Sequence, residues 1–399
     1  MAVSSPIAAA LFLFAAATDP VDTPDYAGDA RALDQMILDY YAYPEHLPEG
    51  RLPDSAKLAE ERAAVHDHRS LLAYAERRIA SLADHHAITG ASFADSWAVV
   101  PTYGDLWISP DGSHYRVEAV RPGSPAAKAG IAVGDRLIAV DGVPVDRAIA
   151  SYWEAMGLSA DGGVRAGYAA RMLVAGRRDR DRDLSFARGG REWRVKLTSL
   201  YALPAEDHAS PVSVTREANG AYAIRYHNSL GDNAAIAAFD AALATVPADA
   251  PVVIDLRDTP SGGNTTVARG AMGWFVNQPT AYQIHNLPSE KRETGIERQW
   301  VEQVLPRVQA VRPKPVAVRV GRWTGSMGEG MAIGFAAMGV PVCGDRMAGL
   351  LGAIYDFPLP SSGMVVKFPA ERLYSVNGQP REEFQPIPAG KCPVPFPGE

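Results

Sequence analysis

The chain has 399 residues, of which 47% are hydrophobic and 21% are charged, and its formal net charge is −7. This length suggests two or three domains, and the composition is typical of a globular protein with enough apolar side chains for a core in each. Because the net charge is negative, it gives no general attraction for nucleic acid or for an anionic membrane, and neither is expected as a partner.

The first residues predict an export signal. Residues 6–17 read PIAAALFLFAAA, a short apolar run that ends in small residues and is followed by a polar stretch. The run is too short to span a membrane, and no Lys or Arg precedes it. We therefore expect a signal peptide over residues 1–24 and a periplasmic or secreted protein. The alternative is a buried or disordered N-terminal tail.

A helical region is predicted over residues 25–98. Apolar side chains recur at three- and four-residue intervals between residues 29 and 41, a proline-rich stretch interrupts the pattern at 44–53, and helical patterns return afterwards. His66 and His68 lie two apart on a predicted helix and so face different sides, which argues against a metal site there.

The next region, residues 99–200, changes to short strands and turns. Residues 123–130 read GSPAAKAG and residues 134–142 read GDRLIAVDG. Local rules predict a short helix capped by Ser124, a stop at Gly130 and a turn at Asp141. In this order the motifs resemble a PDZ domain, which binds an extended peptide as an added strand. A helical insertion is expected over residues 151–175.

Two features of this region bear on its role. The loop that would hold a peptide carboxylate reads TYGDL at residues 102–106, and its acidic Asp105 is unfavourable for that purpose. The sequence thus leaves open whether the PDZ domain binds C-termini or serves in packing and gating. The charged run over residues 177–183 alternates in sign, so we expect a solvated turn or strand edge.

Residues 201–399 alternate strands with helices. Buried strands are predicted at 222–226, 251–256, 315–320 and 340–343, and helices at 233–244, 265–275 and 327–338. This alternation indicates a parallel sheet with helices packed on it. The chain as a whole is therefore expected to be multidomain α+β, with an N-terminal helical region, a PDZ domain and an α/β domain.

Three stretches of the last region carry residues suited to chemistry. Ser326 lies where a buried strand turns into a helix, so its hydroxyl would sit beside unpaired helix N–H groups that can stabilise negative charge. Residues 255–264 read DLRDTPSGGN, a loop whose glycines permit close backbone approach. His227 ends a strand and would serve as a general base. Each has a purely structural alternative when taken alone: a helix cap, a tight turn and a backbone-bonded histidine.

Together these stretches resemble the carboxyl-terminal processing and tricorn-core serine peptidases, over about residues 82–387. The resemblance implies a ClpP/crotonase-like catalytic domain and makes Ser326, in the T-x-S-x-x-E motif, the nucleophile. It assigns the oxyanion hole to the N–H of Met327 and to that of Gly262 or Gly263. His86 falls in an L-x-D-x-H stretch that we interpret as structural.

The family has two catalytic arrangements. One uses a lysine about two dozen residues after the serine, but leucines occupy that place here, at Leu350 and Leu351. The other uses a histidine at the end of the first catalytic strand, which matches His227, and a glutamate near the end of the domain. Glu382 has the better spacing for that glutamate, and Glu383 is the alternative. The tricorn-like branch has a serine where this chain has a tyrosine before the histidine.

The resemblance implies a serine endopeptidase that acts through a Ser-His-Glu acyl-enzyme mechanism on a peptide or protein substrate, with no metal or other cofactor. Two alternatives remain open. One is a catalytically silent PDZ-containing peptide-binding protein on the same scaffold. The other is a crotonase-like acyl-CoA enzyme, against which the PDZ motif and the T-x-S-x-x-E motif both argue. The two cysteines, Cys343 and Cys392, form no metal-binding motif and either pair or remain free thiols.

Overall fold

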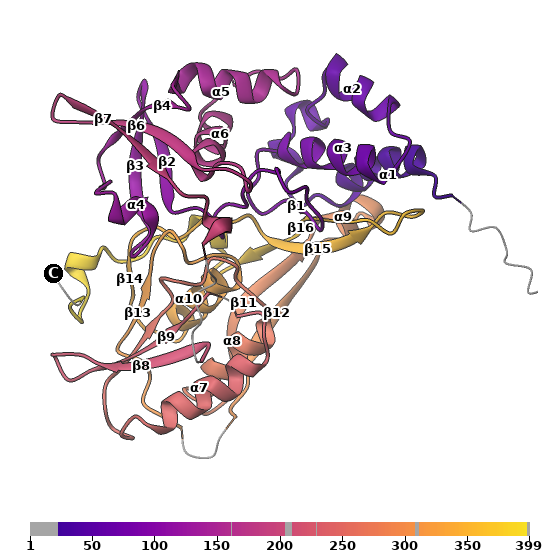
Figure 1. Ribbon diagram of the computed structural model, residues 1–399. Helices are drawn as coiled ribbons and strands as arrows, with labels where there is room; N and C mark the ends of the chain where they lie inside the picture. The colour runs from indigo at the N-terminus through magenta and orange to yellow at the C-terminus, as the bar shows by residue number, and fades with distance from the viewer. Residues whose placement is uncertain (1–22, 161, 204–209, 229, 308–310, 397–399) are drawn as a thin grey trace, which may run out of the picture.

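The computed structural model describes residues 23–396 except 161, 204–209, 229 and 308–310. The predicted signal peptide therefore lies almost wholly outside the described residues. No helix within the described part of the chain is both long and apolar enough to cross a membrane. Mixed helices and sheets build the fold, as the sequence predicts, and Figure 1 shows the N-terminal helices and one sheet above two further sheets.

The N-terminal region is helical, as predicted. Side chains of Asp25, Ser55 and Asp67 accept hydrogen bonds from the first-turn N–H groups of its three α-helices. Such caps satisfy donors that have no partner inside a helix. Two short 3₁₀ turns fill the proline-rich interruption. The elements are α1 (Tyr26–Tyr40), η1 (Pro44–His46), η2 (Pro48–Gly50), α2 (Ala56–Ala63) and α3 (His68–Ala80).

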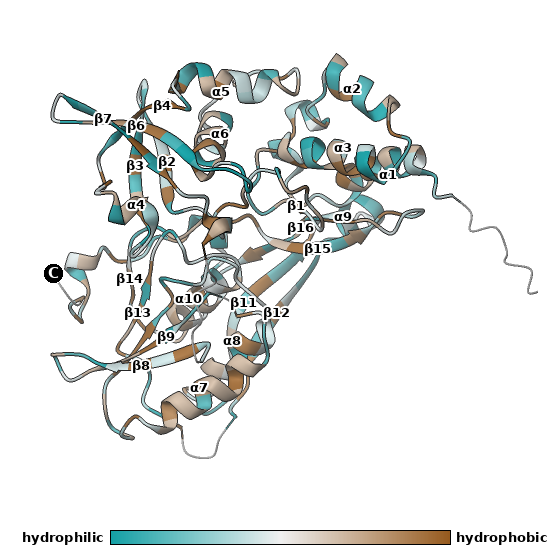
Figure 2. Cartoon of the chain, viewed as in Figure 1, coloured by the Kyte–Doolittle hydropathy of each residue, from teal (hydrophilic) through white to brown (hydrophobic). Residues whose placement is uncertain are grey.

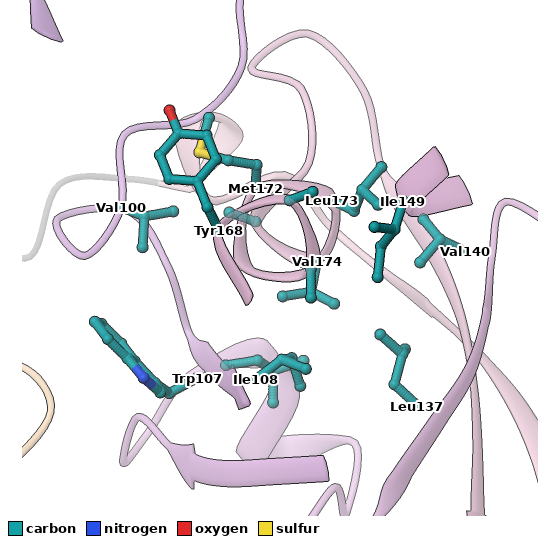
Figure 3. Close-up of a cluster of buried hydrophobic side chains, with 14 of the residues drawn as sticks. Val100, Trp107, Ile108, Leu137, Val140, Ile149, Tyr168, Met172, Leu173 and Val174 are labelled. Carbon is teal, nitrogen blue, oxygen red and sulfur yellow. The ribbon is translucent and has the colours of Figure 1, made fainter. Parts of the chain in front are cut away.

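The second unit is an antiparallel sheet in the strand order β2-β3-β4-β6-β7, with β5 paired to β4. Ser124 caps α4 through the N–H of Ala127, as the sequence predicts. Figure 3 shows Val174 of α6 facing Ile108 of β2, and Leu173 of α6 beside Ile149 of α5. The elements are β2 (Leu106–Asp111), β3 (His114–Val120), α4 (Pro125–Lys128), β4 (Arg136–Val140), β5 (Val143–Pro144), α5 (Val145–Glu154), α6 (Gly163–Ala175), β6 (Arg182–Arg188) and β7 (Arg191–Leu197).

The charged run over residues 177–183 is only partly solvated. Arg182 is buried and donates to both carboxylate oxygens of Asp105, which is also buried and accepts from the N–H of Ala126. The expectation of a wholly solvated turn is thus wrong at Arg182. Through these hydrogen bonds, Asp105 links β6 and α4 to the loop that precedes β2.

A third unit contains the predicted parallel sheet, in the order β14-β13-β10-β9-β8, in which only β8 runs antiparallel. All four residues of β10 and of β13 are buried, which accounts for their mostly apolar sequence. The charged members, Asp255 and Arg319, are paired with Arg257 and Glu217. The elements are β8 (Val212–Arg216), β9 (Tyr222–Tyr226), α7 (Ala234–Ala244), β10 (Val252–Asp255), α8 (Thr265–Met272), β13 (Ala317–Val320), α10 (Met327–Ala337) and β14 (Val342–Gly344).

A second, antiparallel sheet lies on the other side of α10 (Figure 1), and the sequence did not predict it. Figure 2 shows brown, apolar segments on α10 and on the strands beside it. The two-residue strand β1 pairs with β16, so a segment from the N-terminal region is fastened to this sheet. The elements are β1 (Ile88–Thr89), β11 (Thr280–Leu287), α9 (Pro288–Thr294), β12 (Arg298–Val304), β15 (Ala353–Pro358) and β16 (Val365–Tyr374).

The remaining elements are three 3₁₀ turns, one of which belongs to a C-terminal tail that lies against the edge of the parallel sheet. In this tail, Ile387 pairs with Cys343 of β14, and a disulfide joins Cys343 to Cys392. The question that the sequence left open is thus settled in favour of a disulfide. The 3₁₀ turns are η3 (Leu200–Ala202), η4 (Arg381–Glu383) and η5 (Ala389–Lys391).

We predict that the double variant Cys343→Ser/Cys392→Ser unfolds at lower denaturant concentration than the wild type. The cysteines lie 49 residues apart, and closing a loop of that length restricts the unfolded chain by about 4 kcal/mol in the entropic account. Urea unfolding of the oxidised wild type, the reduced wild type and the double variant measures the difference. Equal midpoints for all three would contradict the prediction.

Candidate active site

The turn between β13 and α10 holds Ser326 in an unusual backbone conformation. Its φ is 50° and its ψ is −115°, a region that side-chain-bearing residues rarely adopt and that clusters at functional sites. The turn is fixed to the loop after β10, because the N–H of Thr259 donates to the Trp323 carbonyl and the N–H of Gly325 donates to the Thr259 carbonyl. The sharp strand-to-helix turn presents the Ser326 hydroxyl beside the N-terminus of α10, as a nucleophile elbow does.

Gly262 lies directly against this turn. Its φ is +63°, and a Cβ atom added there would be 2.4 Å from Ser326 Cβ and 2.8 Å from the Met327 nitrogen. Only glycine fits both the conformation and the space. The structure therefore brings together three residues that the sequence singled out: Ser326, Met327 and Gly262.

The peptide N–H groups near Ser326 differ in their partners. Met327 is the first residue of α10, whose leading N–H groups have no carbonyl partner within the helix. The Gly262 N–H donates to the Thr259 carbonyl at 3.2 Å. The neighbouring Gly263 N–H donates to no acceptor within the described residues. Among the described residues, the N–H groups of Met327 and Gly263 are thus uncommitted donors, and that of Gly262 is engaged in the turn itself.

Glu329, in the first turn of α10, is a fully buried structural hub. One of its carboxylate oxygens accepts from the N–H of Ser326 at 2.9 Å, and the carboxylate also accepts from the N–H groups of Gly349 and Leu350. Burial raises the pKa of the Glu329 carboxyl to about 7, although Arg381 and these N–H groups favour its anion. Glu329 therefore ties the serine turn to the loop at 349–351.

The hydroxyl of Ser326 is hydrogen-bonded to His86, at 3.0 Å between Oγ and Nε2. The other ring nitrogen, Nδ1, lies 2.6 Å from the carbonyl oxygen of Leu351. A carbonyl only accepts hydrogen bonds, so Nδ1 must carry the proton, which leaves the Nε2 lone pair facing the serine. This is the tautomer that a general base for Ser326 requires.

Local contacts hold His86 in this place. Its backbone N–H donates to the buried carboxylate of Asp84 at 2.8 Å, and Asp84 also accepts from the hydroxyl of Tyr41. Two residues further on, β1 begins its pairing with β16. Burial lowers the pKa of the His86 imidazole to about 4, and the charge of Arg381 acts in the same direction. The imidazole is therefore neutral, and able to accept a proton, near pH 7.

Comparison with known proteins agrees with this picture at the level of fold. The PDZ-domain family matches residues 116–156, and no curated protein matches the chain. Among solved structures, the photosystem II D1 C-terminal processing protease is similar at 16% identity with a TM-score of 0.54, covering 92% of this chain and 93% of that one. Mature CPAF is similar at 15% identity with a TM-score of 0.56, covering 91% and 92%.

The chain has the fold of these proteases. Its fold class is therefore as the sequence predicts, including the PDZ domain.

Within this protease fold, the expected pairing of Ser326 with His227 is wrong. His227 follows β9, and its Nε2 lies 2.8 Å from the hydroxyl of Ser213 on the adjacent strand β8. The backbone N–H of His227 donates to the Pro211 carbonyl. The place beside the Ser326 hydroxyl is taken by His86, from the stretch that the sequence analysis interpreted as structural.

The expected glutamate also lies elsewhere than predicted. Glu382 accepts a hydrogen bond from the hydroxyl of Tyr43 at 2.8 Å, and Glu383 is exposed. In the described part of the chain neither is bonded to a histidine, and the Leu351 carbonyl takes the position against His86 Nδ1. The histidine beside Ser326 comes from the N-terminal region. Its orienting partner therefore comes from the loop that packs against that region.

The sequence carried one usable signal for His86. Asp84 and His86 are two residues apart before a short strand, and the carboxylate caps the histidine's own N–H. The position is far from Ser326 in sequence and no local rule connects the two.

The tyrosine that replaces the serine before His227 is Tyr226, whose ring stacks on Phe239 in the core.

We predict that Gly262→Ala abolishes catalysis by this site, because the added Cβ would overlap Ser326 Cβ and disfavour the φ of +63°. Gly220→Ala is the matched control: its φ is +86°, but nothing lies within 4 Å of the added Cβ. Peptide hydrolysis and thermal unfolding of the two variants are the measurements. Wild-type activity in a folded Gly262→Ala protein would overturn the placement of Gly262 at the reaction centre.

Proposed function

We propose that this protein is a serine peptidase that hydrolyses peptide bonds of peptide or protein substrates through an acyl-enzyme on Ser326. The observation that carries the proposal is the 3.0 Å contact between Ser326 Oγ and His86 Nε2 at a strained strand-to-helix turn. A serine hydroxyl becomes a useful nucleophile only when an adjacent base accepts its proton. The protease fold of the similar structures supports the same reading.

In the proposed reaction, His86 Nε2 accepts the hydroxyl proton while Ser326 Oγ attacks the substrate carbonyl carbon. The oxygen of the resulting tetrahedral intermediate accepts hydrogen bonds from the Met327 N–H and from a glycine N–H, that of Gly262 or Gly263. His86 then gives the proton to the departing amine. Water, activated by the same imidazole, attacks the ester, and Ser326 regains its proton.

The carbonyl of Leu351 has the orienting role that the family resemblance gives to a glutamate. It fixes the tautomer of His86 and accepts a stronger hydrogen bond when the ring becomes positive. Arg381 holds this loop, because its Nη2 donates to the carbonyls of Leu350 and Gly352 at 2.9 and 2.6 Å. We propose a Ser-His pair with a backbone acceptor in place of the Ser-His-Glu arrangement.

We propose that the PDZ domain gates this site. Trp323, three residues before Ser326, donates through Nε1 to the carbonyl of Gly104, in the loop that precedes β2. Arg121 at the end of β3 pairs with Asp258 at 2.7 Å, in the loop that carries Gly262. Both sides of the proposed reaction centre are thus in direct contact with the PDZ domain, so a change in that domain would reach the catalytic turn.

An oxidising location fits the chain. The disulfide between Cys343 and Cys392 would be expected outside the cytosol, where thiols are not kept reduced. We therefore propose a periplasmic or secreted peptidase, in line with the apolar N-terminal sequence.

We predict that a fluorophosphonate labels Ser326 in the wild type and that Ser326→Ala abolishes the labelling. His86→Ala should slow labelling by about 10²- to 10⁴-fold, the usual contribution of a general base. His227→Ala is the control and should be labelled at the wild-type rate. Labelling rates, with the modified peptide mapped by mass spectrometry, are the measurement.

Two outcomes would count against the proposal. A folded wild type that is not labelled but binds peptides would favour the catalytically silent PDZ protein. Loss of labelling in His227→Ala with normal labelling in His86→Ala would contradict the assignment of the base.

A further inference from the structure

A cavity of about 720 Å³ lies where the three parts of the chain meet. Its walls are the stretch 81–85 before His86, strand β2 and helix α6 of the PDZ domain, and the loop at 346–351. This volume is within the range of sites that bind small molecules or peptide ends. The same loop holds Glu329 and the catalytic histidine, so the cavity and the proposed active site share a wall.

Arg171 of α6 places a buried cation at this cavity. Its Nε donates to His85 Nε2 at 2.8 Å and its Nη1 to the Ile108 carbonyl at 3.3 Å. Within the described residues it forms no ion pair with a carboxylate. Burial and the nearby Arg322 lower the pKa of Arg171 to about 10. A buried cation without an anionic partner is costly, and a bound anion would offset that cost.

Two more arginines stand beside it. Arg171 and Arg322 both contact the ring of Trp107, with Cζ atoms 5.2 and 4.9 Å from its centroid. Arg322 is paired with Glu118. Arg346 is exposed at the cavity and, in the described part of the chain, makes no hydrogen bond or ion pair. The group thus contains one paired cation and two unpaired ones in a protein of net charge −7.

The carboxylates of the cavity do not neutralise these cations. Asp84 accepts from the hydroxyl of Tyr41, and Glu382 accepts from that of Tyr43. Glu118 is the acidic group that faces Arg171 and Arg346, and it is already bonded to Arg322 and to the hydroxyl of Ser109. The unpaired guanidinium groups therefore remain available to a ligand.

We infer that this cavity binds a carboxylate of the peptide substrate, with Arg171 and Arg346 as the donors. The inference rests on the proposed peptidase function. A guanidinium presents planar donors that match the two oxygens of a carboxylate, and such charge-assisted pairs are stronger than neutral ones. The carboxylate belongs either to the C-terminus of the peptide or to an acidic side chain, and the experiment below separates the two.

The test measures peptide binding to the full chain carrying Ser326→Ala, so that nothing is cleaved. Isothermal titration uses the pentapeptide Ala-Ala-Leu-Ala-Ala as the free acid and as the amide, and the amides with Glu or Gln as the last residue. A carboxylate site predicts that the free acid, the Glu amide or both bind about tenfold tighter than the neutral peptides. Tight binding of the free acid alone identifies the C-terminus, and tight binding of the Glu amide identifies a side chain.

Arg346→Gln should remove most of this preference, and its exposed position leaves the core intact. Arg191→Gln, at the exposed start of β7, is the matched control and should keep the preference. The inference is overturned if all four peptides bind equally, if none binds to the folded protein, or if Arg346→Gln leaves the preference unchanged. Fluorophosphonate labelling of the wild type separates the two proposals, because labelled Ser326 without a carboxylate preference would refute only this site.

Discussion

The proposed active site depends on the hydrogen bond between Ser326 and His86, which joins segments 240 residues apart. The serine comes from the turn between β13 and α10, and the histidine from the end of the N-terminal helical region. Neither segment by itself determines where the other lies. The pairing of β1 with β16 brings the histidine to the catalytic unit, and the contacts of the turn with the loop after β10 fix the serine. The N-terminal region is thereby part of the site.

Buried charge organises the surroundings of this pair. The Glu329 carboxylate accepts hydrogen bonds from N–H groups of the serine turn and of the loop at 349–351. Arg381 donates to carbonyls of the same loop, and its Nη2 lies 4.0 Å from the Glu329 carboxylate. Removing one partner would leave the other buried and unpaired, which is strongly unfavourable. The Leu351 carbonyl is therefore held where it fixes the tautomer of His86, and the positive charge of Arg381 helps keep that ring neutral.

Local patterns predicted those parts of the molecule that local physics determines. The strand at Tyr222–Tyr226 and the cap at Ser124 follow from periodicity and capping. The placement of Gly262 beside the serine turn was implied by the family resemblance, and its glycine conformation agrees with that placement. The antiparallel sheet around β16 was missed, because β1 and β11 pair with β16 across long stretches of chain, and only β15 reaches β16 through a short turn. His86 was missed for the same reason: a strand-end histidine near the glycine loop looked suitable, and only tertiary structure shows that another histidine reaches the hydroxyl.

The most direct test of the account is a nitrogen-15 NMR titration of the His86 ring in the intact protein, assigned with His86→Gln. Because burial lowers its pKa below the value of an unfolded chain, the ring should stay neutral as the pH falls from 7 and protonate only near pH 4. We predict the Nδ1–H tautomer at pH 7 and a change in the Nε2 signal when Ser326 is replaced by Ala. A ring that is protonated at pH 7 would contradict the assignment of His86 as the base. So would an Nε2 signal that does not change when Ser326 is replaced by Ala.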